Sequence, residues 1–239
     1  MEIMEYSLVY CAEDGKLHIG DACTEENESL VGGMTDAVYE SESYTGDGHC
    51  LTLDNFSFAT SADIALVVPD KTTVYLKGKN ELRVVNDKGE ANVAVLYSDG
   101  DMTITGDEDG EIVCLPQTKQ GLWSRCVCAR FGDLKVEGGT ICVFAGESKK
   151  SCGLYAGGRF RQVERMGGTI QITGGTVFTS AKTNAVRASE GKLIVEAPAG
   201  QQSVVINAQE FAGGAAAFTG SALTQEESIA PLVITFRSV

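Results

Sequence analysis

Several residue types that common functional sites require are scarce in this chain of 239 residues. It has two histidines, His18 and His49, and one tryptophan, Trp123. Its 19 Lys and Arg stand against 33 Asp and Glu, a formal net charge of −14. That balance disfavours a general nucleic-acid-binding role, because such binding depends on basic groups that neutralise phosphates. Neither a GxSxG motif nor a P-loop is present, so we expect binding or assembly rather than nucleophilic catalysis.

Long apolar runs are also missing. No stretch approaches the roughly 18 consecutive apolar residues that a membrane-spanning helix needs, so we expect no membrane insertion. The first residues, MEIMEYSLVYCAEDGK, lack the basic segment and apolar run of a secretory signal peptide. Taken as it stands, the sequence predicts a cytoplasmic chain without a signal peptide. The alternative is a domain of a longer, exported protein.

Only 4 Pro accompany 28 Gly, which predicts a folded chain with many tight turns, because glycine readily adopts positive φ. The 8 Cys are too dispersed for a disulfide-framework miniprotein, and we expect reduced cysteines on strands. Cys126 and Cys128 form a CxC pair of a kind that binds metal. No second pair and no nearby His completes a zinc site around it.

Charge is distributed unevenly along the chain. The first 50 residues hold twelve Asp or Glu and one basic residue, Lys16. From Lys149 to Lys192, eight basic residues accompany two acidic ones. Such clusters are usually solvated surface, and the alternative for the basic one is an anion-binding patch centred on GGRFRQVER.

An internal repeat is the strongest pattern in the sequence. Four segments place apolar residues two apart after a glycine: GDMTITG, GDLKVEGG, GTIQITGG and GKLIVEAP. Equivalent positions are 23, 28, 32, 36 and 23 residues apart, counted along Leu51, Val74, Met102, Leu134, Ile170 and Leu193. A minimum near 23 with variable extra length indicates coils with loop insertions. The alternation within each segment is typical of a strand with one buried face.

A second strand precedes each glycine corner, and a third strand follows the first. The second strands are AVLYS, CVCAR, GLYAG and AVRAS, and the third are EIVCL, TICVF and TVFTS. Aligned from their first letters, the second strands predict an outward column of Leu96, Cys128, Tyr155 and Arg187.

Three short strands and glycine-rich corners per coil predict an all-β fold, a right-handed parallel β-helix or solenoid. We assign this domain to residues 50–239 and an acidic N-terminal cap to residues 1–49, because an exposed sheet edge invites association. A β-sandwich needs no such in-register repeat, and a propeller blade needs about 40 residues.

The phrases TTVYLKGKNELRV, GDMTITG, GLYAGG and GGTIQITGGTV resemble those of Gly-rich parallel β-helix proteins of Firmicutes and related bacteria labelled carbohydrate-binding domain-containing. The resemblance covers about 60% of the chain, from Leu51 to about Ala197. It implies a β-helix in a surface or secreted protein, which the N-terminus does not support. It also implies acidic polysaccharide and calcium as ligands, since some of the resembling proteins are thought to bind them.

Candidate ligand-binding residues come from loop insertions and the outward column, because variable loops on a rigid solenoid carry most binding sites. They are Trp123, Tyr155, Arg159, Phe160, Arg161 and Arg187. The stretch YSDGDMTITGDEDGEIVC adds six carboxylates, Asp99, Asp101, Asp107, Glu108, Asp109 and Glu111. They predict either a calcium site near Asp107 and Asp109 or a solvated acidic turn. Because strand-forming residues separate the two groups of acids, we expect two corners rather than one cage.

These observations lead to one hypothesis and two alternatives. The hypothesis is a non-catalytic β-helical module that binds glycan or another extended polymer through a lateral face, with assistance by calcium left open. The first alternative is a structural, adhesin-like protein that assembles as a homo-oligomer. The second is a pectate-lyase-like polysaccharide lyase, in which calcium would bind the sugar carboxylate and a Lys or Arg would be the base. No acid and base pair is indicated by spacing.

Overall fold

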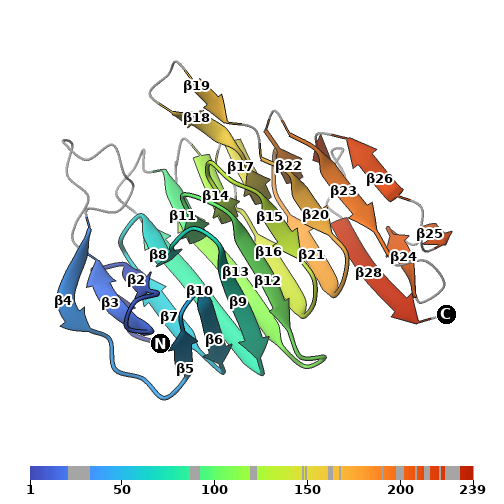
Figure 1. Ribbon diagram of the computed structural model, residues 1–239. Coiled ribbons are helices and arrows are strands. Elements are labelled where there is room, and N and C mark those ends of the chain that lie inside the picture. Colours follow the sequence, from blue (N-terminus) through green and yellow to red (C-terminus); the bar gives the residue numbers. More distant parts are fainter. Residues whose placement is uncertain are drawn as a thin grey trace.

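The computed structural model of the protein describes residues 1–20, 33–86, 92–118, 123–146, 148, 150–160, 164–166, 168–189, 191–197, 202–207, 209–212, 216–220, 222–223 and 232–238. Over these residues the chain forms strands and turns and no helix. The described part therefore holds no helix long and apolar enough to cross a membrane. Figure 1 shows the strands stacked along the length of the molecule, with the two termini toward opposite ends.

Within the described residues, the strands form three large sheets, here named A, B and C, and a two-stranded one. Sheet A contains, in order, β1 (Ile3–Met4), β7 (Ser57–Thr60), β10 (Lys79–Asn86), β13 (Glu111–Thr118), β16 (Thr140–Phe144), β21 (Thr176–Ser180), β28 (Leu232–Ser238), β24 (Gln202–Ile206) and β25 (Gln209–Ala212). Sheet B contains β27 (Ala222–Leu223), β22 (Asn184–Ala188), β17 (Lys150–Ala156), β14 (Trp123–Ala129), β11 (Val93–Ser98), β8 (Ile64–Val68), β2 (Leu8–Cys11), β3 (Lys16–Gly20) and β4 (Met34–Val38). Sheet C contains β26 (Ala216–Gly220), β23 (Leu193–Glu196), β20 (Ile170–Ile172), β15 (Leu134–Val136), β12 (Met102–Gly106), β9 (Thr72–Lys77), β6 (Cys50–Asp54) and β5 (Tyr44–Asp47). The small sheet pairs β18 (Gly158–Phe160) with β19 (Glu164–Met166).

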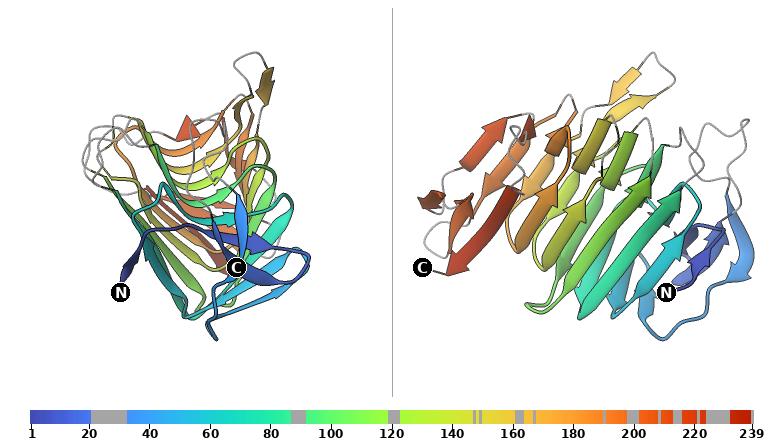
Figure 2. Two further views of the ribbon diagram at one scale, coloured as in Figure 1. Left: turned by 90° about the vertical axis from the view of Figure 1, so that its left-hand side faces the viewer. Right: turned by 180° about the vertical axis from the view of Figure 1, so that it is seen from behind.

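The chain passes through the large sheets in one repeated order. From β9 it visits sheets C, A and B as β9, β10 and β11, then as β12, β13 and β14, and then as β15, β16 and β17. Equivalent strands of these coils pair in parallel. In the left view of Figure 2, the strands of successive coils overlie one another around a common interior. The all-β arrangement is compatible with a β-solenoid, as the sequence repeat predicted.

The pairing in sheet C agrees with the predicted repeat except at one step. Four predicted pairs are present: Leu51 with Val74, Met102 with Leu134, Leu134 with Ile170, and Ile170 with Leu193. The prediction that Val74 pairs with Met102 is wrong, because Met102 pairs with Thr72 and Val74 with Ile104. A slip of two residues keeps every side chain on its own face, so the predicted core residues remain buried.

One hydrophobic core extends through the described chain. It includes Leu8 and Leu17 from the first strands, Leu134 and Ile170 from the coils, and Ile234 from β28. Each of these side chains is buried. Since burying one such side chain contributes roughly 1.5–3 kcal/mol, the stacked aliphatic residues dominate the stability of the fold.

Sheet B corrects the predicted outward column. Leu96 pairs with Val127, and both lie in the core, whereas Tyr97 pairs with Cys128. Leu96 is therefore not outward, and Tyr97 takes its place in the column. The corner from Ser98 to Met102 is one residue shorter than the equivalent corner from Ala129 to Leu134. Our alignment assumed equal corners, and a slip of one residue exchanges the two faces of a strand.

Each coil strand of sheet B also bends once. Pairing is interrupted at Val95 and at Cys126, and at both places two successive residues face the core. Cys126 consequently belongs to the core, while Cys128 belongs to a second cluster with Tyr97 and Tyr155. The CxC pair thus does not present two thiols on one face. The seven cysteines of the described chain are all free, and Cys23 lies outside the described residues.

The two ends of the molecule use antiparallel pairing. At the N-terminal end, β2 pairs antiparallel with β3 and parallel with β8, and β5 pairs antiparallel with β6. Residues 1–49 thereby add strands to the sheets that the coils form. At the C-terminal end, β28, predicted as the strand PLVITF, pairs antiparallel with β21 and β24. The division into a cap and a domain at residue 49 stays a prediction.

Candidate functional site

A groove lies at the corner where sheet C passes into sheet A. Corner residues of three successive coils and one residue of β28 line it: Gly106, Asp107, Glu108, Gly138, Gly139, Thr140, Gly175, Thr176 and Phe236. The volume of the groove is about 360 Å³, within the range of roughly 300–1,000 Å³ that is typical of small-molecule sites.

Stacked glycines form the floor of the groove. Gly139 and Gly175 have φ values of +74° and +76°, a region that residues with a Cβ rarely adopt. A Cβ on Gly175 would lie 2.3 Å from the carbonyl oxygen of Gly139, and one on Gly106 would lie 2.6 Å from that of Leu76. The coils therefore approach so closely that the floor consists of peptide groups.

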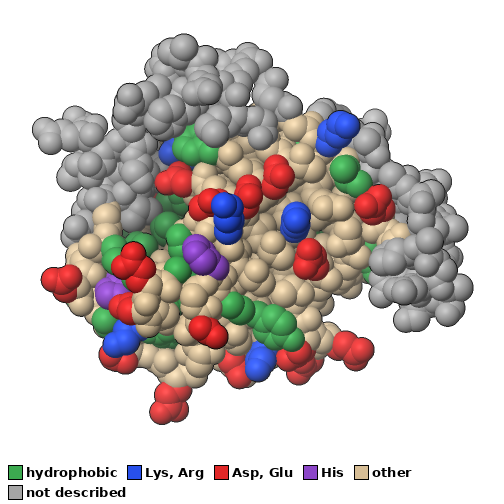
Figure 3. All heavy atoms as spheres, in the orientation of Figure 1, with side chains coloured by type: hydrophobic (Ala, Val, Ile, Leu, Met, Phe, Trp, Pro, Cys, Tyr) green, Lys and Arg blue, Asp and Glu red, His purple; other side chains and the backbone are tan. Residues whose placement is uncertain are grey.

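Two exposed carboxylates, Asp107 and Glu108, stand at the side of this floor. The Tyr75 hydroxyl donates a hydrogen bond of 2.6 Å to Asp107 Oδ1. That bond raises the pKa of Tyr75 above its ordinary value, because ionising the phenol would break it. Figure 3 shows acidic side chains spread over the face in view and along its lower edge.

Hydroxyl groups and one aromatic ring complete the lining. Thr140 and Thr176 are the first residues of β16 and β21 and pair with each other in register. Thr176 also pairs with Thr235 of β28, which places the half-buried Phe236 next to the glycine floor. The groove thus combines carboxylates and hydroxyls, which hydrogen-bond polar ligands, with a ring that can cover an apolar ligand face.

Of the two predicted calcium ligands, Asp107 lines the groove and Asp109 does not. Both carboxylates are exposed. Within the described chain, neither residue belongs to a cluster of three Asp, Glu, His or Cys side chains. Calcium takes six to eight oxygen ligands, so an ion here would need oxygens from water or from a bound ligand. A calcium site at this turn stays a prediction.

The acids at the preceding corner, where sheet B passes into sheet C, have a structural role. The backbone N–H of Asp101 donates to Asp70 Oδ1 at 2.7 Å, and that of Asp133 donates to Asp101 Oδ1 at 2.8 Å. The N–H of Thr169 donates to Asp133 Oδ1 at 2.7 Å. We call Asp70, Asp101 and Asp133 the aspartate ladder. The sequence signal for it is the GD dipeptide that precedes β12 and β15.

Trp123 and Tyr155, two of the predicted ligand-binding residues, lie on either side of Arg125. The Arg125 Cζ atom is 4.2 Å from the centroid of the Trp123 ring and 3.7 Å from that of Tyr155. These are cation–π distances. Tyr155 is only 9% exposed. The guanidinium therefore covers one face of each ring, and Tyr155 has little exposed surface left for a stacked sugar.

The remaining predicted residues lie near this stack or outside the described part. Arg187 is exposed and pairs with Tyr155 on the next coil. Arg159 and Phe160 belong to β18, whose hairpin with β19 projects from the three sheets in Figure 1. The side chains of these two residues, and all of Arg161, lie outside the described residues. Trp123, Tyr155 and Arg187 are thus together on sheet B, and the groove with Asp107 is on another side.

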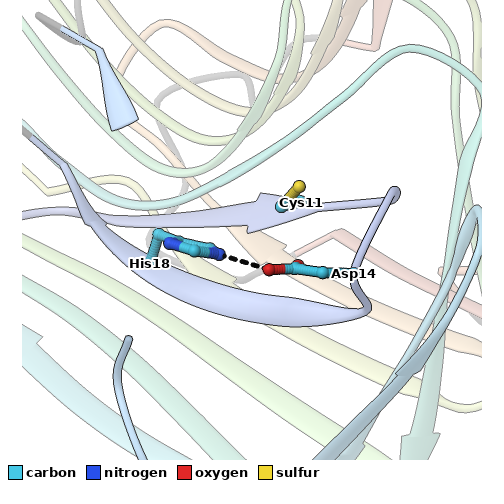
Figure 4. Close-up of side chains that lie close together, drawn as sticks. All are labelled: Cys11, Asp14 and His18. Atoms are coloured by element: carbon cyan, nitrogen blue, oxygen red, sulfur yellow. Dashed lines mark hydrogen bonds and ion pairs between the residues drawn. The ribbon is translucent and has the colours of Figure 1, made fainter. Parts of the chain in front are cut away.

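Sequence analysis missed a third cluster, on the β2–β3 hairpin. Cys11, Asp14 and His18 place one ligand atom each within 4.8 Å of one another (Figure 4). His18 Nε2 lies 2.9 Å from Asp14 Oδ2. The hydrogen bond with His18 lowers the pKa of the Asp14 carboxyl. The sequence signal for this cluster is the spacing C-x-x-D-x-x-x-H around the turn EDG. It was missed because histidines were considered only as partners of Cys126 and Cys128.

Comparison of the chain with protein-family models, with curated proteins and with solved structures finds no match. The resemblance to Gly-rich β-helix proteins stays a prediction, and the function has to be argued from these sites.

Proposed function

We propose that this protein is a non-catalytic module with a right-handed parallel β-helix that binds glycan or another extended polymer in the groove between sheets C and A. The observation that carries the proposal is the lining of the groove, with two carboxylates, two hydroxyls and one aromatic ring over a glycine floor. Sugar rings present hydroxyls at their rim and C–H groups on their faces, and this lining matches both.

The repeat of the groove along the stack favours an extended ligand. Gly106, Gly139 and Gly175 belong to three successive coils. Neighbouring strands are about 4.8 Å apart, so the corners span roughly 10 Å. A linear polymer lying across the coils would meet glycine peptide groups at each step and a threonine at two of them, which suits repeating units better than a compact molecule.

Calcium has a defined part in this proposal. The groove is acidic, so a neutral glycan would bind through hydrogen bonds, whereas an acidic one would be repelled by Asp107 and Glu108. A calcium ion that bridges these carboxylates to an acidic sugar would remove the repulsion and complete its own oxygen shell.

The lining favours binding over the lyase alternative. None of the described residues that line the groove is Lys, Arg or His. Two of the candidate arginines are engaged on sheet B, away from the groove, since Arg125 lies against two rings and Arg130 donates to the Tyr97 hydroxyl at 3.2 Å. The Lys or Arg base of the lyase alternative is therefore absent from the described lining, where a proton at a sugar carbon would meet only carboxylates.

The outer face of sheet A favours assembly as a second candidate function. Val113, Cys142 and Phe178 pair in register on this face and are partly exposed, and Phe144 is 45% exposed. A concentration-dependent mass in sedimentation equilibrium, reduced by Phe144→Asp, is expected if this face joins copies of the chain. A constant monomer mass would contradict it.

A glycan array with and without calcium tests the main proposal. Bound glycans should lose affinity by about 10-fold or more in Phe236→Ala and in the double variant Asp107→Asn, Glu108→Gln, because each removes one component of the lining. Asp109→Asn is the matched control, since it changes charge on the same turn outside the groove. A loss of glycan affinity in Trp123→Ala or Tyr155→Ala would instead place the binding site on sheet B. Glycan affinity that is unchanged in the groove variants would refute binding in the groove.

A further inference from the structure

The hairpin of β2 and β3 brings a thiol, a carboxylate and an imidazole to one place. Val9 pairs with His18 and Cys11 with Lys16, so Cys11 and His18 are diagonal neighbours on the same face. Gly15, with φ of +70°, donates its N–H to the Cys11 carbonyl at 2.9 Å and closes the turn that carries Asp14. Figure 4 shows Asp14 on the turn directed toward His18, with Cys11 beside them.

The contacts around His18 leave one of its two ring nitrogens without a matching hydrogen-bond donor. His18 is 7% exposed, and its Nδ1 lies 2.9 Å from the carbonyl oxygen of Thr35 in β4. Its Nε2 faces Asp14 Oδ2 at 2.9 Å. Both neighbours are hydrogen-bond acceptors, and a neutral imidazole carries only one N–H. If Nδ1 donates to Thr35, a lone pair on Nε2 faces the Asp14 carboxylate, and if Nε2 donates to Asp14, a lone pair on Nδ1 faces the Thr35 carbonyl oxygen. A second proton, or a cation bound at Nε2 while Nδ1 donates, satisfies both contacts.

The position of Cys11 distinguishes these two solutions. A proton between His18 and Asp14 needs no third partner. A metal ion needs further ligands, and Cys11 Sγ lies within 4.8 Å of both ligand atoms. The thiol is partly exposed and free, so it is accessible to an ion, which it would ligate as a thiolate.

The surroundings orient the ligands as in metal sites. The Thr35 carbonyl oxygen holds Nδ1, which leaves Nε2 directed at the cluster. The backbone N–H of Lys16 donates to Asp14 Oδ1 at 3.0 Å, which leaves Oδ2 directed at it. Backbone partners of this kind fix the tautomer and the orientation of metal ligands. The acidic first 50 residues, with Lys16 as the one basic residue, also favour a cation electrostatically.

We propose that Cys11, Asp14 and His18 bind a divalent transition-metal ion of the zinc class, with a water molecule as fourth ligand, and that the ion ties β3, β2 and their turn together. Thiolate and imidazole select such ions over calcium and magnesium. Zinc bonds of about 2.0–2.3 Å put tetrahedral ligands roughly 3.3–3.8 Å apart, so side-chain shifts of about 1 Å close the site.

Cobalt(II) titration of the chelator-treated, reduced full chain tests the proposal directly. We expect one ion per chain, visible d–d bands of tetrahedral cobalt and a thiolate-to-cobalt band in the near ultraviolet. Zinc should displace the cobalt and raise the melting temperature of the protein, while calcium and magnesium should not displace the cobalt. No spectral change, or a spectrum without the thiolate band, would overturn the proposal.

Three variants assign the ligands. Cys11→Ser should remove the thiolate band and weaken zinc binding by more than about 100-fold, because it replaces a ligand and leaves the shape of the side chain. In His18→Asn the amide can still donate to Thr35 but offers no ring nitrogen, so the same loss is expected. Cys142→Ser, which changes another partly exposed free thiol on sheet A, is the matched control. Binding that survives Cys11→Ser, or that is lost in Cys142→Ser, would refute the assignment even if His18→Asn fails to fold.

Discussion

The two corners that flank β12 use the same residue type in different ways. Before the strand, Asp101 accepts the backbone N–H of Asp133 in the next coil, so its carboxylate is part of the aspartate ladder. After the strand, Asp107 and Glu108 are exposed and line the groove. All three acids lie within the single stretch YSDGDMTITGDEDGEIVC.

The difference follows from how each corner satisfies its backbone. At the first corner, backbone N–H groups of Asp101, Asp133 and Thr169 have no carbonyl partner in register and bond to side chains instead. At the second corner, the N–H of Thr140 reaches Gly110 and that of Thr176 reaches Gly139. Peptide groups satisfy one another there, because glycine lets the coils approach, and the acids remain available to a ligand.

The largest effect should come from a side chain added to the glycine corner. Gly175→Ala combines a positive φ with a Cβ 2.3 Å from the Gly139 carbonyl oxygen, and should lower the free energy of unfolding by about 3 kcal/mol or more. Gly48 also has positive φ but nothing within 4 Å of an added Cβ, so Gly48→Ala should cost only about 1 kcal/mol. Urea unfolding of both variants measures the difference, and equal losses would contradict the close approach of the coils.

The next effect should come from the aspartate ladder. Asp101→Ala removes the acceptor of the Asp133 N–H and should lower the free energy of unfolding by about 1.5 kcal/mol. Asp109→Ala, at the other corner, should change it by less than about 0.5 kcal/mol, because its side chain is exposed and outside the ladder. If the two variants unfold at the same urea concentration, the two corners do not differ as described.

A smaller effect is expected from calcium. Asp107 and Glu108 supply few of the six to eight oxygens that the ion needs. Without a ligand, calcium should therefore raise the melting temperature of chelator-stripped protein by less than about 2 °C. A glycan that binds the groove should increase this shift, and Asp107→Asn should abolish the increase while Asp109→Asn keeps it. A large shift with calcium alone would indicate a complete protein site.

The smallest effect concerns the rate at which the Cys142 thiol is alkylated. Burial, and then the Glu111 carboxylate, raise the pKa of Cys142 to about 11. Because little thiolate exists at pH 8, alkylation of Cys142 should be slow. Glu111→Gln removes the negative charge and lowers that pKa, so the rate should rise a few-fold. Peptide mass spectrometry after timed alkylation measures it, with Glu137→Gln as the control for net charge. An unchanged rate would show that burial alone controls this thiol.

The candidate sites were predictable only in part. Composition singled out Asp107, and the strand between the two groups of acids indicated two corners, which the structure confirms. Phe236 was not predicted, because an antiparallel strand from the far end of the chain brings it beside Gly175. Cys11, Asp14 and His18 were passed over, because the spacing of a hairpin cluster follows from its turn and matches no standard zinc motif.

The sequence by itself determined the strands, the coils and the buried apolar residues, because the alternation of side chains and the glycine corners are local properties of the chain. The slip of two residues at Met102 left these predictions intact, and the slip of one at Leu96 did not. Only the tertiary structure decided which carboxylates accept backbone N–H groups and which stay exposed at the groove. A carboxylate accepts a bond where the neighbouring coil places an unpaired N–H beside it, and it stays exposed where the neighbouring coil places a glycine there. Which of the two lies beside it depends on the register between the coils and not on the sequence of either coil.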